Sequence, residues 1–400
     1  MQSRAETPND AASPRQGLLA LRVHRVIEET SDARSFVLDV PEELERELRY
    51  VPGQYLTVDV PWEGFRVHRC YSLSSAPGLD PRPTITVKRV EGGRVSNHLV
   101  DRVREGDLLE VHRPAGRFVL DPHRGSRPLV FFAGGSGITP IHSMLKSVLA
   151  SGGSARLLYA NRNAESTIFA AELEELASSN PGRFELRHHR DDASGYLVAE
   201  GVRAFVGERL DADFYVCGPK PFMDLVGRVL RESGVPEGHV RIENFVSPTD
   251  PDRRAEAGTA ASDRPAPAAF LVTLGKKIHS VPYASGRTLL ASCKSAGVKA
   301  PSSCEDGFCG SCMCKLVEGE VDMDNPLALT DLDIERGRVL ACQARPRTSG
   351  PLHIDFDSVS FGLAAEGEGG APPLSLVRLA VVAVLCVAVA WLVRFLHHTV

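Results

Sequence analysis

The sequence has little aromatic content and no surplus of positive charge. Aromatic side chains make up 6% of the 400 residues, and 46 Lys and Arg against 51 Asp and Glu leave a net charge of −5. Nucleic-acid binders need a basic surface, and single-strand binders add aromatic platforms, so no nucleic-acid partner is expected. The 35 Gly and 27 Pro are too few for a fibrous or wholly disordered chain.

The first residues also lack an apolar run. Residues 1–16 are polar, so the sequence predicts a disordered tail and no secretory signal. Nine cysteines are present, an odd number, and four of them lie between Cys304 and Cys314. In a chain without an export signal, this pattern favours metal or redox chemistry over a disulfide framework.

Hydrophobic patterning divides the chain into three folded units. Residues 17–125 alternate apolar and polar side chains between turn signals, which predicts an antiparallel β-barrel. Residues 126–246 alternate strands with helices and predict an α/β domain with a parallel sheet. A linker by composition, residues 247–269, precedes a compact third unit over residues 270–358.

A long apolar run follows a second linker, residues 359–373. The segment 374–396 would be about 34 Å long as a helix, enough to span a hydrocarbon core of about 30 Å. Arg378 and Arg394 flank its charge-free centre. A buried core helix and an amphipathic surface helix are the alternatives. Because the segment is apolar on all faces, we expect a transmembrane anchor.

Four cysteines have the spacing of a plant-type [2Fe-2S] site. Cys304-x4-Cys309-x2-Cys312 is followed, after 29 residues, by Cys342. Three thiolates from one loop and a fourth from a distant strand can then converge on two irons. Structural zinc is the main alternative, but it usually shows two Cys-x2-Cys pairs. Four other cysteines are interpreted as structural thiols: Cys70, Cys293, Cys314 and Cys386.

Two short motifs in the first unit suit a flavin. Arg69, Tyr71 and Ser72 close a predicted strand and offer a phosphate-binding guanidinium, a ring and a hydroxyl. The segment 93–96 opens a predicted helix, whose free N–H groups can bind a pyrophosphate. Each motif alone also fits an ordinary strand surface or a plain N-cap. The candidate contacts in the helix are Gly93, Val95 and Ser96.

A glycine-rich loop in the second unit predicts a nucleotide site. The segment 134–140 follows an apolar strand and opens a helix, where glycines let phosphates approach the backbone. The segment 217–219 ends a later strand, and α/β ligands bind at the carboxyl ends of such strands. A simple turn and a core cysteine are the alternatives. The candidate residues are Gly134, Gly135, Gly137, Thr139, Pro140, Cys217, Gly218 and Pro219.

Taken in order, these motifs resemble the ferredoxin–NADP reductase superfamily with a plant-type ferredoxin joined at the C-terminus. The resemblance spans about residues 18–357 and is nearest to oxygenase and desaturase reductases, typified by the phenylacetyl-CoA epoxidase and 3-ketosteroid 9α-hydroxylase reductases. It implies a flavin-binding barrel, a nucleotide-binding α/β domain and an α+β, β-grasp-like ferredoxin domain. It favours FAD over FMN and places Glu243 and Phe245 near the flavin edge.

The resemblance also implies an NAD(P)H-dependent reductase. Electrons would pass from NAD(P)H through the flavin to the cluster, with Ser72, Cys217 and Glu243 beside the reacting groups. Arg162 follows the second strand of the nucleotide domain and could meet the 2′-phosphate of NADPH. It could equally be a surface arginine, so the choice between NADH and NADPH stays open.

The C-terminal segment extends these expectations to the partner. A tethered reductase gains effective concentration toward membrane partners, so the expected acceptor is a membrane di-iron oxygenase or a fatty-acid desaturase. Because NAD(P)H is intracellular, we expect a single-pass tail anchor in the lipid bilayer and catalytic domains in the cytoplasm. The alternatives are a reductase of a soluble multicomponent monooxygenase and a membrane-bound redox sensor. Seven acids between Glu318 and Glu335 could steer a basic partner or form a solvated face.

Overall fold

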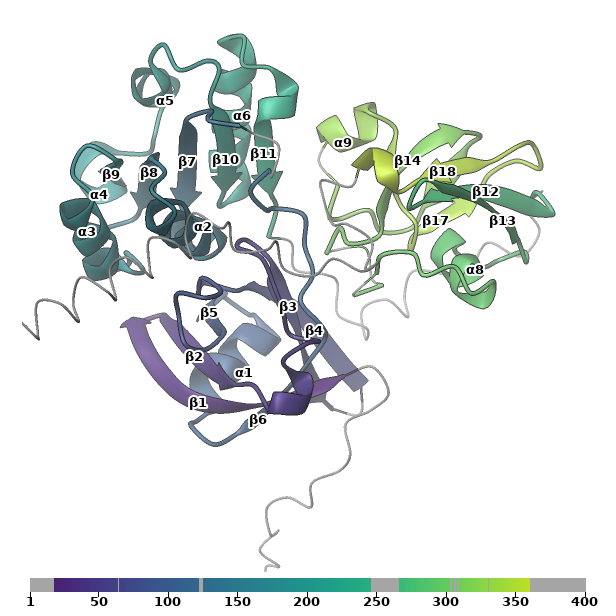
Figure 1. The fold of residues 1–400 in the computed structure, drawn as a ribbon, viewed down its shortest axis with the longest axis horizontal. Coiled ribbons are helices and arrows are strands. Elements are labelled where there is room, and N and C mark those ends of the chain that lie inside the picture. Colours follow the sequence, from purple (N-terminus) through teal and green to yellow (C-terminus); the bar gives the residue numbers. More distant parts are fainter. Residues whose placement is uncertain are drawn as a thin grey trace, which may run out of the picture. The chain divides into compact units, whose positions relative to one another are not determined.

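Three folded units occupy the part of the chain that the computed structural model describes (Figure 1). The described residues are 18–63, 65–121, 125–245, 266–302, 304, 305, 307, 309–329 and 331–359. The expected N-terminal tail, most of the expected linker at 247–269, Cys386 and the expected anchor at 374–396 lie outside them. Within these ranges, no helix is both long enough and apolar enough to cross a bilayer.

The first unit is the antiparallel barrel that the alternating pattern predicts. Its elements are β1 (Leu19–Thr30), β2 (Ala33–Asp39), η1 (Glu42–Leu44), β3 (Tyr55–Trp62), β4 (Phe65–Ser72), β5 (Thr84–Lys88), α1 (Arg94–Arg102) and β6 (Leu108–Val111). The six strands lie in the order β4-β3-β6-β1-β2-β5, and a bridge between Leu73 and Ile85 joins the two edges. Leu21, Phe36 and Val58 fill the interior and are fully buried.

The second unit is the predicted α/β domain. Its elements are β7 (Leu129–Gly134), η2 (Gly135–Gly137), α2 (Ile138–Ala150), β8 (Ala155–Asn161), α3 (Ala170–Ser179), β9 (Phe184–Arg190), α4 (Asp191–Ser194), α5 (Ala199–Val206), β10 (Asp213–Cys217), α6 (Lys220–Glu232), η3 (Glu237–His239) and β11 (Val240–Glu243). All five strands run parallel, in the order β11-β10-β7-β8-β9. Their carboxyl ends therefore meet at one edge of the sheet.

Helices cover both faces of this parallel sheet. Phe131 and Tyr215 pack with α2 and α3 on one face, and Phe132 and Phe214 pack with α5 and α6 on the other. The first of these cores also contains Phe118, which follows the barrel and meets the Tyr215 ring edge-on at 5.6 Å. The α/β core on this face thus extends into the barrel unit, which has a separate core of its own.

The third unit is a small mixed sheet with two short helices. Its elements are β12 (Ala269–Leu274), β13 (Lys277–Pro282), α8 (Leu289–Ser295), β14 (Met313–Glu318), β15 (Val321–Met323), α9 (Asp331–Glu335), β16 (Arg338–Leu340), β17 (Ala344–Pro346), β18 (His353–Asp355) and η4 (Asp357–Val359). Five strands lie in the order β13-β12-β18-β14-β16, and β15 pairs with β17. Cys293 and Cys314 are fully buried in this core, as expected for structural thiols.

The third unit begins close to its predicted boundary. Ala269 was expected to end the linker, but it begins β12, where it pairs with Pro282 of β13. Cross-strand pairing, which composition does not reveal, ends the linker there.

The turn before β3 depends on a glycine. Gly53 has φ +97°, and a Cβ at this position would lie 1.9 Å from the Phe118 carbonyl oxygen. Gly78 has φ +78° with open space around it. We expect Gly78→Ala to cost about 1 kcal/mol, which is the conformational penalty, and Gly53→Ala to cost about 3 kcal/mol because backbone must also move. Unfolding in urea, monitored by the release of flavin, measures the loss of folding free energy in both variants. Equal losses would contradict the steric argument.

Candidate functional site

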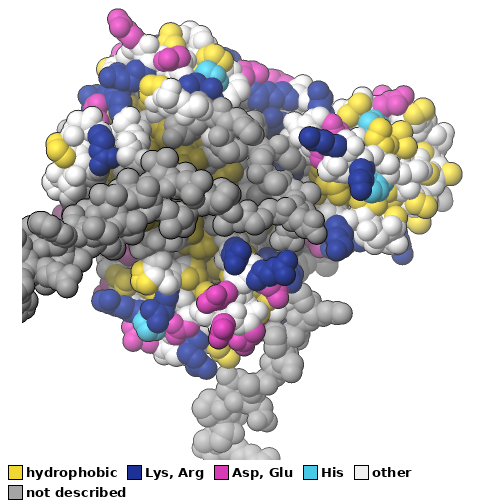
Figure 2. Space-filling model, viewed as in Figure 1, with side chains coloured by type: hydrophobic (Ala, Val, Ile, Leu, Met, Phe, Trp, Pro, Cys, Tyr) yellow, Lys and Arg dark blue, Asp and Glu magenta, His cyan; other side chains and the backbone are white. Residues whose placement is uncertain are grey.

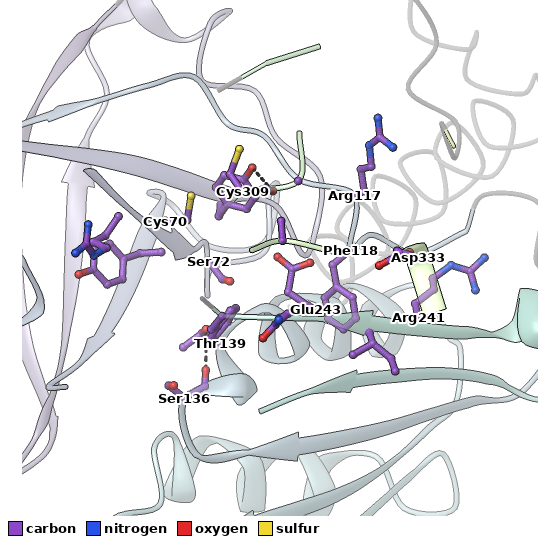
Figure 3. A pocket seen from close by; sticks show the side chains of 18 of the residues that line it. Cys70, Ser72, Arg117, Phe118, Ser136, Thr139, Arg241, Glu243, Cys309 and Asp333 are labelled. Atoms are coloured by element: carbon purple, nitrogen blue, oxygen red, sulfur yellow. Dashed lines mark hydrogen bonds between the residues drawn. The ribbon is translucent and has the colours of Figure 1, made fainter. Parts of the chain in front are cut away.

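A cavity of about 640 Å³ is lined by residues from all three units (Figure 3). Ser72 comes from the barrel, Glu243 from the carboxyl end of β11, and Cys309 from the third unit. Ser136 of η2 and Thr139 at the start of α2 also line the cavity, and the Thr139 hydroxyl donates to the Ser136 carbonyl at 3.0 Å. The candidate flavin, nucleotide and cluster residues therefore converge on one place.

The barrel contributes the carboxyl end of β4 to this cavity. Arg69, Tyr71 and Ser72 all line it, as does Cys70 between them. Burial raises the pKa of the Tyr71 phenol, so the hydroxyl stays protonated. Because Ser72 lies opposite Tyr55 in the β3–β4 register, its place is fixed by strand pairing. A guanidinium, a ring and a hydroxyl on one cavity wall fit a flavin and its phosphates.

The start of α1 forms the next part of the same wall. Gly93 is the N-cap and supplies no side-chain hydrogen bond to the helix, so the first N–H groups face the cavity without a side-chain cap. A Cβ on Gly93 would lie 2.4 Å from the Ser96 hydroxyl oxygen, which accepts a hydrogen bond from the Val90 N–H at 3.3 Å. Val95, also a predicted contact, is buried beside them. This arrangement fits a pyrophosphate group.

Close backbone packing shapes the nucleotide loop. A Cβ on Gly137 would lie 2.1 Å from the Cys217 carbonyl oxygen, and one on Gly134 would lie 2.9 Å from the Pro219 ring. A Cβ on Gly218 would in turn lie 3.0 Å from the Gly134 backbone. The segments 134–140 and 217–219 therefore pack against each other at the carboxyl ends of β7 and β10. Ser136 and Thr139 of the first segment line the cavity at the amino end of α2, a position that suits the phosphates of a dinucleotide.

Two residues expected beside the reacting groups differ in exposure. The Cys217 side chain is fully buried and does not line the cavity, and burial raises the pKa of its thiol well above the usual value. Glu243, its partner in the β10–β11 register, does line the cavity. Burial and the nearby Cys309 thiolate raise the pKa of Glu243 to about 8. Phe245 is 42% exposed and lies at the mouth.

The four cysteines lie in two pairs. The Cys304 thiol donates to Cys309, which lowers the pKa of Cys309 to about 5, and the Cys312 thiol donates to Cys342, which lowers the pKa of Cys342. Each pair also has a backbone hydrogen bond to sulfur. The Cys304 N–H donates to Cys309 Sγ and the Cys342 N–H donates to Cys312 Sγ, each at 3.5 Å.

This pairing distinguishes a two-iron cluster from a single zinc ion. Among the described residues, no three of the four sulfurs come within 4.8 Å of one another, as ligands of one ion would. Two thiolates for each of two irons is the arrangement that a [2Fe-2S] cluster needs. The donor set therefore fits that cluster.

Sequence reasoning missed several cavity residues. Tyr55, Arg117, Phe118 and Arg241 line the cavity, and Cys70 lines it although it was interpreted as structural. Cys70 shares a hydrogen bond of 3.3 Å with the Thr57 hydroxyl. The only available signal was its position inside the 69–72 motif. For Arg117, which follows the last barrel strand, the sequence offers no signal.

Arg162 lies apart from the cavity. Its guanidinium donates to Asp32 of the barrel at 3.0 Å, and its side chain is 71% exposed. The arginine is therefore a surface residue with an ion-pair partner, which leaves the nucleotide preference undecided.

The acidic segment of the third unit is neutralised in part. Three of its seven acids form ion pairs with arginines that follow the segment in the chain: Glu320 with Arg347, Asp333 with Arg338, and Asp324 with Arg345. On the face shown in Figure 2, acidic and basic side chains are interspersed. These pairs favour the solvated-face interpretation over steering of a basic partner.

This geometry defines a flavin- and nucleotide-binding reductase with an iron–sulfur domain. Three family profiles match the chain in agreement with it: an oxidoreductase FAD-binding domain over residues 20–120, an oxidoreductase NAD-binding domain over 131–228, and a 2Fe-2S iron-sulfur cluster binding domain over 272–347.

Similar proteins narrow the class. The ferredoxin reductase component of 3-ketosteroid-9-alpha-monooxygenase from Rhodococcus rhodochrous is 40% identical over 340 residues, 84% of this chain and 96% of that protein. A component of 1,2-phenylacetyl-CoA epoxidase from Escherichia coli K12 is 30% identical over 85% of this chain and 98% of its own. The structure of phthalate dioxygenase reductase matches with 30% identity and a TM-score of 0.54, over 85% of this chain and 98% of that one.

The chain belongs to the family of oxygenase reductases that combine FAD-binding, NAD-binding and [2Fe-2S] domains. The resemblance drawn from the motifs is confirmed, and FAD, NAD(P)H and a [2Fe-2S] cluster are its redox groups. The chain is an oxidoreductase that passes electrons from NAD(P)H to an oxygenase.

The cysteine pairing gives a direct prediction. Cys309→Ala removes one ligand of the Cys304–Cys309 pair, so we expect loss of the iron–sulfur absorbance and of most bound iron. Cys293→Ala, a buried thiol in the same unit that is no ligand, should keep both. Iron analysis and visible spectra measure the outcome, and a Cys309→Ala protein with the full spectrum would refute this ligand set.

The raised pKa of Glu243 gives another. The folded protein holds this proton more tightly than the unfolded chain does, so Glu243 is protonated at pH 7. We expect a carboxylic-acid infrared band that titrates near pH 8 and is missing in Glu243→Gln. Relative to that variant, the native protein should lose stability as the pH rises from 4.5 through 8. A band that titrates near 4.5 would contradict the assignment.

Proposed function

We propose that this reductase serves a membrane-bound di-iron oxygenase or desaturase. The supporting observation is the apolar segment 374–396, which follows the three catalytic units and is long enough to span a bilayer. A single anchor of this kind would confine the reductase to the membrane that contains its acceptor and so raise its effective concentration there. The catalytic units would then lie in the cytoplasm, where NAD(P)H is available.

The cavity explains how the three catalytic units work together. A bound FAD would supply the conversion of a hydride from NAD(P)H into single electrons for a [2Fe-2S] cluster held by the third unit. Arg69 and the start of α1 are suited to hold the flavin phosphates, and the glycine loop 134–137 the nucleotide. Glu243 keeps a proton at its carboxyl group inside the cavity, because burial disfavours the charged carboxylate.

A second acceptor class has its own supporting observation. The relative from Rhodococcus rhodochrous is named as the reductase of a 3-ketosteroid monooxygenase, and at 40% identity it is similar over most of both chains. A monooxygenase that acts on a ketosteroid is therefore the alternative partner. A membrane-bound redox sensor has less support, because the related proteins are named as oxygenase components.

A truncation separates the anchor from the chemistry. We compare the full chain with a chain that ends at Pro373, both reduced anaerobically with NADH and with NADPH. Flavin and iron–sulfur bands should bleach to the same extent in both chains, since the cavity is unchanged. After alkaline carbonate washing, the full chain should remain in the membrane fraction and the shorter chain should be released.

The outcomes divide the proposal into its parts. Release of the full chain by carbonate would refute the membrane anchor, and with it the proposed membrane partner. It would favour the monooxygenase alternative. Bleaching of the flavin without the cluster would refute the electron route itself. The nucleotide that bleaches both bands at the lower concentration identifies the preferred donor.

A further inference from the structure

Among the described residues, Tyr55 and Arg117 are two side chains of the barrel unit that hydrogen-bond to the iron–sulfur unit. The Tyr55 hydroxyl donates to the Cys309 carbonyl at 3.0 Å, and the Ser311 hydroxyl lies 2.6 Å from the same phenol oxygen. Since the phenol has one proton and gives it to Cys309, Ser311 is the donor in the second bond. A barrel strand is thereby joined directly to the loop that carries three cluster ligands.

Burial along β3 supports this contact. All six residues from Tyr55 to Val60 are buried, although an antiparallel strand often has one solvated face. The Tyr55 ring is fixed from behind by Gly116, where a Cβ would lie 2.9 Å from the ring. Tyr55 is thus rigid, and it stands opposite Ser72, which lines the flavin end of the cavity.

Arg117 makes the second contact, and it carries a charge. Its guanidinium donates to the carbonyl oxygens of Met313 at 2.6 Å and Val359 at 3.0 Å, with Ser311 at 3.5 Å. Figure 3 shows it on the cavity wall. Among the described residues no carboxylate pairs with this guanidinium. Burial lowers the pKa of Arg117, and the nearby Cys314 and Cys312 act in the opposite direction. The acceptors Ser311 and Met313 are the chain neighbours of the cluster ligand Cys312 on either side. Arg338, the other cation nearby, is already paired with Asp333.

A half-buried cation beside a cluster ligand favours negative charge on the cluster. One-electron reduction adds one negative charge to the cluster, and the electron comes from flavin that NAD(P)H has reduced. Coulombic attraction is strong where water is scarce, so Arg117 favours the reduced cluster over the oxidised one. Arg117 belongs to the barrel and the cluster to another unit, so this attraction requires that the two be docked.

We propose that Arg117 is an electrostatic docking residue, which holds the iron–sulfur unit on the barrel and raises the cluster's reduction potential only while that unit is docked. Docking would favour electron transfer from the flavin. Separation from the barrel would make the same cluster a stronger reductant for the oxygenase. The inference rests on the electron-transfer function of the family. It adds that the cluster's reduction potential is higher when the iron–sulfur unit is docked than when it is separated. Tyr55 is the uncharged positioning residue of the same contact.

The test uses the full-length holoenzyme and a mediated redox titration of the cluster followed by electron paramagnetic resonance. Arg117→Gln removes the charge and should lower the midpoint potential, whereas Arg117→Lys keeps the charge and should restore most of it. Arg113→Gln is the matched control, because Arg113 is exposed and forms its ion pair with Glu47 of the same unit. It should leave the potential unchanged.

Hydrogen exchange supplies a readout that does not depend on turnover. Loss of a charged hydrogen bond should raise exchange of the 309–313 amides about tenfold in Arg117→Gln. Tyr55→Phe should raise it by a smaller factor and should also lower the potential, since the docked fraction falls. A Tyr55→Phe, Ser311→Ala cycle should show coupling between the two hydroxyls.

Each result decides the question. An unchanged potential in Arg117→Gln, or an equal fall in Arg117→Gln and Arg117→Lys, would overturn the electrostatic role. Unchanged exchange in both Tyr55→Phe and Arg117→Gln would overturn the docking contact. Failure of NAD(P)H to reduce the native cluster would instead refute the electron route, because the mediated titration does not need the nucleotide.

Discussion

The pairing of β3 with β4 is the constraint on which the site depends. It sets Tyr55 opposite Ser72, so one strand pair fixes both the flavin wall of the cavity and the contact with Cys309. Side chains alternate along strands, and a slip of one residue would send Tyr55 into the barrel core and Leu56 out of it. Gly53 and Gly116 permit this packing, because a Cβ on Gly53 would collide with the Phe118 carbonyl and one on Gly116 with the Tyr55 ring.

The α/β domain solves a different problem, the close approach of backbone to backbone. Gly134, Gly137 and Gly218 lie where two strand ends meet, and a methyl group at any of them would contact the other segment. The position suited to the dinucleotide phosphates therefore follows from the parallel order of β7 and β10 and from the small size of these residues. The core around Phe118 and Tyr215 ties this domain to the barrel.

Local chemistry was predictable from the sequence, and contacts between distant segments were not. Cysteine spacing, the strand-loop-helix context of 134–140 and the 69–72 motif each depend on neighbours in the chain. Arg117 was missed because its partners, Met313 and Val359, lie about two hundred residues away. Cys217 was placed on the right strand end, but its full burial depends on how β10 packs between β7 and β11. Charged residues show the same limit, since Arg162 was considered for a phosphate but pairs with Asp32 of another unit.

Burial also determines which ionisable groups in and next to the cavity stay neutral. The pKa values of Tyr71, Cys70 and Cys217 are raised mainly by desolvation, so these groups stay neutral, and Glu243 keeps its proton for the same reason. Arg117 is a charged residue of the cavity lining that contacts the loop of cluster ligands, since its guanidinium donates to the Ser311 and Met313 carbonyls on either side of Cys312. Where burial limits access of water, its positive charge acts on the cluster more strongly than it would in bulk solvent.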